Sequence, residues 1–64
     1  MHIYKLTILE KDMFHIPNVN RLAQKLESNY STTSSEGKVI YELNFPTYEH
    51  MDAFIQEIIK LKLI

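Results

Sequence analysis

The alternation of residues 38–45 constrains the fold more than any other feature of the sequence. In KVIYELNF, apolar side chains alternate with mostly polar ones, which is typical of a strand with one buried face. The only glycine of the chain, Gly37, directly precedes this segment, and Pro46 follows it. Glycine supplies the positive φ that a tight hairpin at Glu36-Gly37 needs, and proline ends the strand. The expected core face consists of Val39, Tyr41, Leu43 and Phe45.

Two further segments favour extended structure. Residues 2–9, HIYKLTIL, are rich in β-branched and aromatic side chains and place Tyr4, Leu6 and Ile8 on one face. Residues 30–35 are polar, with a tyrosine and two threonines, and their two faces do not differ in hydrophobicity, so they predict a weak edge strand. Residues 10–16 predict a connection. Its apolar side chains are expected to fold over one end of the core: Met13, Phe14 and Ile16.

Two segments show helical periodicity. Pro17 suits the first turn of a helix, and Asn18 could cap that turn. The apolar stripe of this first helix is Val19, Leu22, Ala23 and Leu26, and Asn20 is among the residues expected to face water. Thr47 is expected to cap a second helix, with Glu49 in its first turn. The inward stripe of this helix is Met51, Phe54, Ile55, Ile58 and Leu61.

The order of these elements is β-α-β-β-α, in one domain over residues 1–64. A right-handed crossover, with a hairpin that returns the third strand between the first two, gives an α+β two-layer sandwich. The prediction is a ferredoxin-like (split β-α-β) layout with two helices on one face of a three-stranded sheet. Residues 61–64 either end the second helix or form a stub of a fourth strand, which is therefore truncated or absent.

Composition excludes several classes of protein. Seven Lys and Arg against eight Asp and Glu give a net charge of −1, without the basic excess of a dedicated nucleic-acid binder. The chain has no cysteine, so disulfides and thiolate metal clusters are excluded. We see no apolar run long enough to span a membrane and no secretory signal, and we expect a cytoplasmic protein that makes no membrane contact.

The residue types that carry catalysis or bind metals are present but do not form a motif. The spacing of His2, His15 and His50 matches no metal site. Glu10 and Asp12 lie near His15 in sequence and could imitate a carboxylate–histidine pair, yet no nucleophile lies at a recognisable offset. We therefore expect no enzymatic activity, no catalytic residues, no cofactor and no bound metal.

Self-association is the main expectation, because chains this short commonly need a disulfide, a metal or a subunit interface. Without a fourth strand, residues 3–9 would form an unpaired edge. The outward face there is partly apolar, and the stripe of the second helix is wide, covering an arc of about 160° at 100° per residue. The predicted interface residues are Ile3, Lys5, Thr7, Leu9, Ile40, Tyr48 and Ile59.

The leading functional hypothesis is a non-enzymatic protein–protein interaction module or small regulatory protein. We expect a homodimer formed through the first strand or the outer sheet face, and binding of another protein by strand addition. One alternative is a regulatory domain that senses a small molecule at a dimer interface. Another is a weak nucleic-acid-binding accessory protein that uses Lys11, Arg21 and Lys25. Six lysines against one arginine, and eight isoleucines, resemble coding in an AT-rich bacterial or phage genome.

Overall fold

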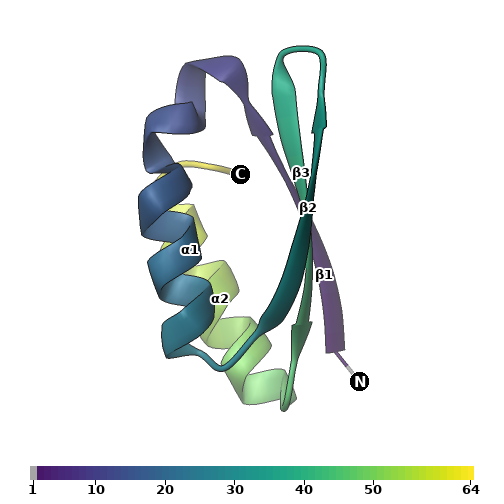
Figure 1. Cartoon of the computed structure of the whole chain (residues 1–64). Helices are drawn as coiled ribbons and strands as arrows, with labels where there is room; N and C mark the ends of the chain where they lie inside the picture. The colour runs from purple at the N-terminus through teal and green to yellow at the C-terminus, as the bar shows by residue number, and fades with distance from the viewer. Residues whose placement is uncertain (1) are drawn as a thin grey trace.

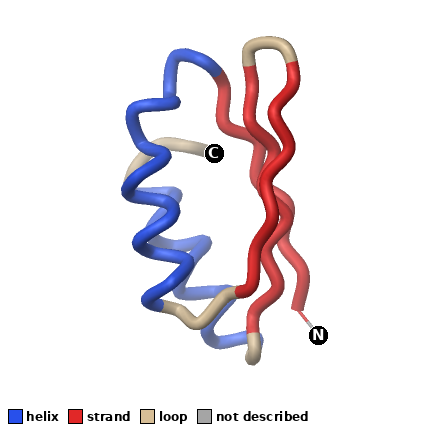
Figure 2. Tube along the Cα trace, viewed as in Figure 1, coloured by secondary structure: helices blue, strands red, loops and turns tan. Residues whose placement is uncertain are grey.

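A helical layer packs on one face of a sheet in the computed structural model, which describes residues 2–64 (Figures 1 and 2). The elements are β1 (His2–Leu9), the 3₁₀ helix η1 (Glu10–His15), α1 (Ile16–Lys25), β2 (Asn29–Ser35), β3 (Lys38–Phe45) and α2 (Tyr48–Lys60). The predicted α+β architecture, with two helices and three strands, is therefore confirmed. The short helix η1 is an addition to the predicted order.

The sheet has the strand order β1-β3-β2, and both neighbouring pairs are antiparallel. The central strand β3 places Glu42 opposite Lys5 of β1, and Leu43 opposite Tyr30 of β2. The chain passes from β2 to β3 through the predicted turn, where Gly37 has a φ of 67°. Since β3 separates the other two strands, β1 and β2 are the two edges of the sheet.

The core lies between the sheet and the two helices. Phe54 of α2 is at its centre, because its ring packs against Tyr4 of β1 and Phe45 of β3, with centroid separations of 6.2 Å and 5.2 Å. The fully buried side chains are Leu6, Ile8, Val19, Ala23, Tyr41, Leu43, Phe45, Phe54 and Ile58. All nine belong to the predicted core faces and stripes. The remaining predicted core residues are half-buried around them.

The connection between β1 and α1 differs from its prediction. Residues 10–15 form a 3₁₀ helix, and Ile16 begins α1. Met13 and Ile16 pack against the core as expected, because residues three apart share one side of a 3₁₀ helix. The prediction for Phe14 is wrong: its side chain is 71% exposed and its ring lies 4.2 Å from that of His15.

The two helix starts also differ in how well they were predicted. Thr47 caps α2 as expected, since its hydroxyl oxygen accepts the backbone N–H of His50 at 3.1 Å. The prediction that Asn18 caps α1 is wrong, because the N-cap position is His15 and no side-chain cap is made there. Asn18 instead lies inside the first turn, where its Nδ2 is 3.3 Å from His15 Nδ1.

The segment after α2 turns back onto the core. Lys62 has a φ of 60°, and the N–H of Leu63 donates to the carbonyl of Ile58 at 3.0 Å, as in a Schellman C-cap. Leu63 then packs against the core. Within residues 2–64, therefore, residues 61–64 form no fourth strand, and β1 pairs with β3 alone.

One polar contact joins α1 to the sheet. The hydroxyl of Tyr41 donates to Asn20 Oδ1 at 2.6 Å, so the expectation that Asn20 faces water is only partly correct: this side chain is half-buried. Burial of Tyr41 raises the pKa of its hydroxyl above the usual value, and the neighbouring Tyr30 raises that pKa further. The native state therefore favours the neutral phenol.

This raised pKa predicts a loss of stability at alkaline pH. The pKa of an unfolded tyrosine is near 10, which is below the pKa of Tyr41 in the native state. The contribution of Tyr41 to stability is therefore fully present below about pH 10 and is lost as the pH rises further. Tyr41→Phe should lower the free energy of unfolding at neutral pH by about 1 kcal/mol and reduce the alkaline loss. Urea unfolding across this pH range measures both. The exposed Tyr48→Phe is the control, and an equal alkaline loss in Tyr41→Phe and wild type would contradict the prediction.

Candidate functional site

The free edge of β1 presents a defined row of backbone groups. The N–H of Glu10 donates to the carbonyl of Gly37 at 2.8 Å, and these residues continue the register in which Leu9 lies opposite Lys38. Hydrogen-bonded and non-hydrogen-bonded pairs alternate along antiparallel strands. The even-numbered residues of β1 therefore direct their N–H and C=O groups toward β3. Those of the odd-numbered residues point away from the sheet: Ile3, Lys5, Thr7 and Leu9.

The same four residues place their side chains on the outer face of the sheet, away from the helices. All four are exposed, with Ile3 at 54% and Leu9 at 48%. Neither apolar side chain belongs to the core cluster. Each odd-numbered residue of β1 thus offers both backbone hydrogen-bonding groups at the edge and an accessible side chain beside them.

The centre of the outer face is polar. Lys5 Nζ lies 3.8 Å from Glu42 Oε2 across the two strands, and both side chains are exposed, so this pair contributes little stability. A shallow depression of about 360 Å³ lies beside the pair, and Ile40 contributes to its lining. Ile40 is half-buried. The apolar ends of β1 therefore flank a charged middle.

A second apolar surface lies on the flank of α2 that is turned away from α1. The side chains of Tyr48 and Ile59 are 58% and 47% exposed. The ring of Tyr48 makes an edge contact with that of His2 in β1, with centroids 6.3 Å apart. At 100° per residue, the half-buried Ile55 lies within about 40° of both around the helix, and between them along its axis. This α2 flank (Tyr48, Ile55 and Ile59) follows the same side of the molecule as the free edge of β1.

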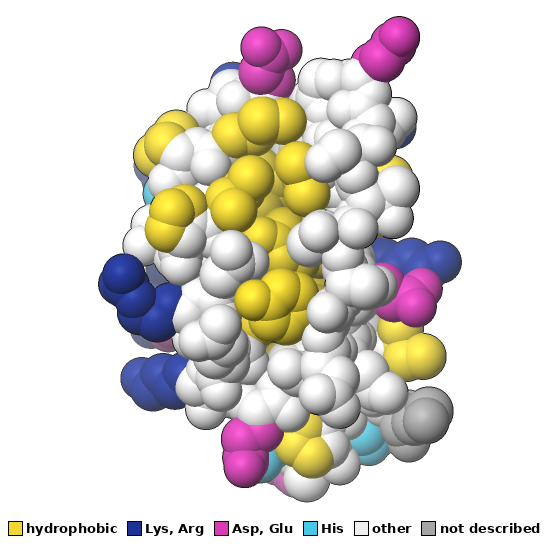
Figure 3. All heavy atoms as spheres, in the orientation of Figure 1, with side chains coloured by type: hydrophobic (Ala, Val, Ile, Leu, Met, Phe, Trp, Pro, Cys, Tyr) yellow, Lys and Arg dark blue, Asp and Glu magenta, His cyan; other side chains and the backbone are white. Residues whose placement is uncertain are grey.

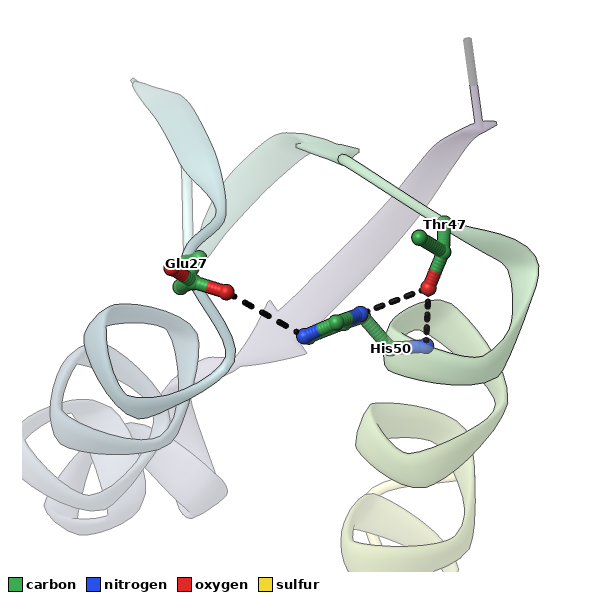
Figure 4. Close-up of polar contacts among 3 residues, drawn as sticks. All are labelled: Glu27, Thr47 and His50. Atoms are coloured by element: carbon green, nitrogen blue, oxygen red, sulfur yellow. Dashed lines mark hydrogen bonds and ion pairs between the residues drawn. The ribbon is translucent and has the colours of Figure 1, made fainter.

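A carboxylate, an imidazole and a hydroxyl line up where α1 and α2 approach each other (Figure 4). Glu27 Oε2 is 3.3 Å from His50 Nε2, and His50 Nδ1 is 2.6 Å from Thr47 Oγ1. The order resembles that of a nucleophile, base and orienting acid, but the hydroxyl already accepts the backbone N–H of His50 as the helix cap. We therefore assign these contacts to the structure of the helix end. His15 makes its polar contact with Asn18 and has no ion pair with Glu10 or Asp12 among the described residues.

Glu27 holds a strained backbone position at the end of α1. Its φ is 60°, and the N–H of Ser28 donates to the carbonyl of Ala23 at 2.9 Å, so Glu27 takes the left-handed position of a Schellman cap, where glycine is preferred. We expect Glu27→Gly to raise the free energy of unfolding by about 1 kcal/mol, because the left-handed conformation costs roughly this much for residues with a β-carbon. Thermal and urea unfolding measure the change.

The control for this substitution is Glu27→Gln. Glutamine keeps the β-carbon but loses the charge that faces His50, which should cost less than about 1 kcal/mol at an exposed position. The difference in free energy of unfolding between the two variants measures the cost of the left-handed backbone conformation at position 27. A glycine variant less stable than the glutamine variant would show that side-chain contacts of Glu27 outweigh the strain.

Three cationic side chains line the groove between α1 and α2. A cavity of about 280 Å³ between α1 and α2 is lined by Arg21, Lys25 and Lys60 around Leu22 and Leu61. Glu57 also lines it and pairs with Lys60 at 3.1 Å. Arg21 and Lys25, two of the three residues expected to contact nucleic acid, therefore lie in the same groove. The third, Lys11, belongs to η1. Nucleic-acid binding stays a prediction.

An apolar seam is open on the opposite flank of α1. Figure 3 shows hydrophobic side chains gathered between α1 and the sheet. The edge strand β2 turns only one large side chain, Tyr30, toward the core, followed by Thr32 and Ser34. These small residues leave the neighbouring apolar residues half-buried, which gives the seam a physical cause in the composition of β2.

Neither the residue groupings nor comparisons with known proteins indicate a function. Among residues 2–64, no three His, Asp or Glu side chains group in a way that could hold a metal ion, and no helix there is long and apolar enough to cross a membrane. Neither the family models, the curated proteins nor the solved structures include a match to this chain. The geometry of the site is therefore the only basis for assigning a function.

Proposed function

We propose that this protein is a non-enzymatic interaction module that pairs with a second copy of itself through the free edge of β1. One observation carries the proposal: the outward N–H and C=O groups of four residues of β1 have no strand partner within residues 2–64. Such a row is a template for pairing with another chain. Strand addition satisfies the row without any rearrangement of the core.

The fold assignment supports the same partner position. We propose that the β-α-β-β-α order, with the sheet order β1-β3-β2, is a split β-α-β, ferredoxin-like arrangement without its fourth strand. In the full arrangement the fourth strand lies beside β1. A strand from the second copy would occupy this same position, so the sheet would be completed between molecules.

The apolar surfaces favour association over a solvated edge. Ile3, Leu9, Tyr48 and Ile59 are each about half exposed, and all lie on β1 or on the α2 flank beside it. Burial of apolar area contributes about 25 cal/mol per Å², so covering these side chains adds to the backbone hydrogen bonds. β2, the other edge, carries mainly serine and threonine, and the apolar seam beside it consists of half-buried side chains.

The edge of β1 also suits an extended segment of another protein. Main-chain hydrogen bonds would supply affinity, and the side chains at alternate positions would select the partner. Because both partners would use one edge, self-association and capture of another protein would exclude each other. Dimerisation would then regulate access to the binding edge.

The first test of the proposal is the solution mass of the wild-type protein, measured by light scattering after size exclusion at several concentrations. We expect a mass of twice the 7.6 kDa chain at high concentration, and a shift toward the single chain on dilution. A single-chain mass throughout the micromolar range would contradict the proposed self-association.

A further inference from the structure

Resting on the proposed self-association, we infer that the two β1 strands join in one antiparallel register, with Leu6 facing Leu6 of the partner subunit on the two-fold axis. Ile3 then lies opposite Leu9 of the partner subunit, and Lys5 lies opposite Thr7 of the partner subunit. The inference follows from the direction of the backbone groups, the length of β1 and the position of its one charge.

The direction of the backbone groups limits the possible registers. Only the odd-numbered residues of β1 direct N–H and C=O groups outward, so odd-numbered residues of the two copies must lie opposite each other. This condition also keeps the helices of both copies on the same face of the joined sheet. Three registers place odd-numbered residues opposite each other along most of β1. They have Lys5, Leu6 or Thr7 on the two-fold axis.

Hydrogen bonding and charge separate these three registers. With Leu6 on the axis, every outward residue of β1 lies opposite an outward residue of the partner subunit. With Lys5 on the axis, two lysines face each other, which is destabilising, and Leu9 has no opposite residue in β1. With Thr7 on the axis, Ile3 has none. Only the Leu6 register uses the whole edge and keeps the two lysines apart.

The side chains also match in the Leu6 register. The two exposed apolar ends of β1, Ile3 and Leu9, meet each other across the interface twice, once on each side of the axis. Lys5 faces the hydroxyl of Thr7 of the partner subunit and can keep its contact with Glu42, 3.8 Å away. On the helical face, Tyr4 lies opposite Ile8 of the partner subunit.

The position of α2 gives independent support. Through Phe54, α2 packs on both β1 and β3, so its axis lies between these two strands. In the joined sheet, the β1 strands of the two copies would be neighbours, about 4.8 Å apart. The axes of the two α2 helices, one from each copy, would then lie about 10 Å apart. Packed helices lie at about 8–10 Å. The α2 flank would be buried there, which accounts for the wide apolar arc of this helix.

Cysteine pairs test the register directly, because the chain has no cysteine of its own. We would prepare Ile3→Cys, Thr7→Cys and Leu9→Cys, all at exposed positions, and oxidise them with oxidised glutathione singly and in mixed pairs. Directly opposite residues of a hydrogen-bonded pair have Cα atoms about 5.5 Å apart, within the range of about 4.4–6.8 Å that a disulfide spans. Residues displaced by two positions are about 7–8 Å apart and should not be joined.

The inferred register predicts that the mixture of Ile3→Cys and Leu9→Cys forms a disulfide-linked dimer, while each variant alone does not. A cross-link in the mixture of Ile3→Cys and Thr7→Cys would indicate Lys5 on the axis, and a cross-link in Thr7→Cys alone would indicate Thr7 on the axis. Either result, with a wild type that is dimeric by mass, overturns the register but leaves self-association intact. If the wild type is dimeric and none of these cross-links forms, the register is overturned as well. If the wild type is monomeric, the proposed function itself is overturned.

Discussion

Replacing Phe54 with alanine should lower the free energy of unfolding by about 3–5 kcal/mol. Phe54 is fully buried and connects α2 to both β1 and β3 through ring contacts with Tyr4 and Phe45. Truncation of a buried phenylalanine costs about 3–5 kcal/mol. A domain of this size has a total stability of about 3–10 kcal/mol, at roughly 0.05–0.15 kcal/mol per residue. The substitution therefore removes much of the free energy of unfolding.

Circular dichroism during thermal and urea unfolding measures this loss, and Phe14→Ala is the matched control. Phe14 is the same residue type but is 71% exposed on η1, so its truncation should change the free energy of unfolding by less than about 0.5 kcal/mol. If Phe14→Ala proved as damaging as Phe54→Ala, the assignment of the core to the space between the sheet and α2 would be wrong.

Replacing Thr7 with proline should convert the proposed dimer into a folded monomer. The N–H of Thr7 points away from β3, as the contact between Glu10 and Gly37 indicates, so proline removes no hydrogen bond from the sheet of its own chain. It removes an outward donor at the middle of the edge and places a ring there, which blocks strand addition. We expect the mass to fall to 7.6 kDa at concentrations where the wild type is dimeric, with an unchanged circular dichroism spectrum.

Thr32→Pro is a close control for this experiment. In the register of β2 with β3, Ser35 lies opposite Lys38 at the two-residue turn, so the backbone N–H and C=O groups of the even-numbered residues of β2 point away from β3. Thr32 is thus an exposed threonine with an outward N–H on the other edge. The same change there should leave the dimer intact. Loss of the dimer in both variants would indicate a general effect of proline on the sheet, and persistence in both would exclude the edge of β1.

Much of the architecture follows from sequence periodicity. The alternation over residues 38–45 predicts the central strand, and the structure buries Tyr41, Leu43 and Phe45 of it. The cap at Thr47 and the turn at Gly37 are also as predicted, because both depend on short-range chemistry that few residue types provide. These local signals predict the order of the three strands and the two α-helices, but not the short helix η1.

Other features depend on contacts that short-range patterns do not encode. The contact between Glu27 and His50 joins residues far apart in sequence, whereas the sequence pattern indicates a nearby partner for His15. Phe14 is exposed because a 3₁₀ helix, rather than an irregular connection, sets its direction. The end of α2 turns inward through Lys62 in a left-handed conformation, which no glycine marks. For the edge of β1, the sequence predicted the residues, but the direction of each backbone group required the observed register.

Amide hydrogen exchange of β1 tests the central claim most directly, because it reports on the backbone groups that self-association would satisfy. In the dimer, the N–H groups of Lys5 and Thr7 should exchange much more slowly than those of Thr32 and Ser34, the outward groups on β2. On dilution to the monomer the two sets should exchange at similar rates. If Lys5 and Thr7 exchange as fast as Thr32 and Ser34 while the protein is dimeric by mass, the copies do not join through β1.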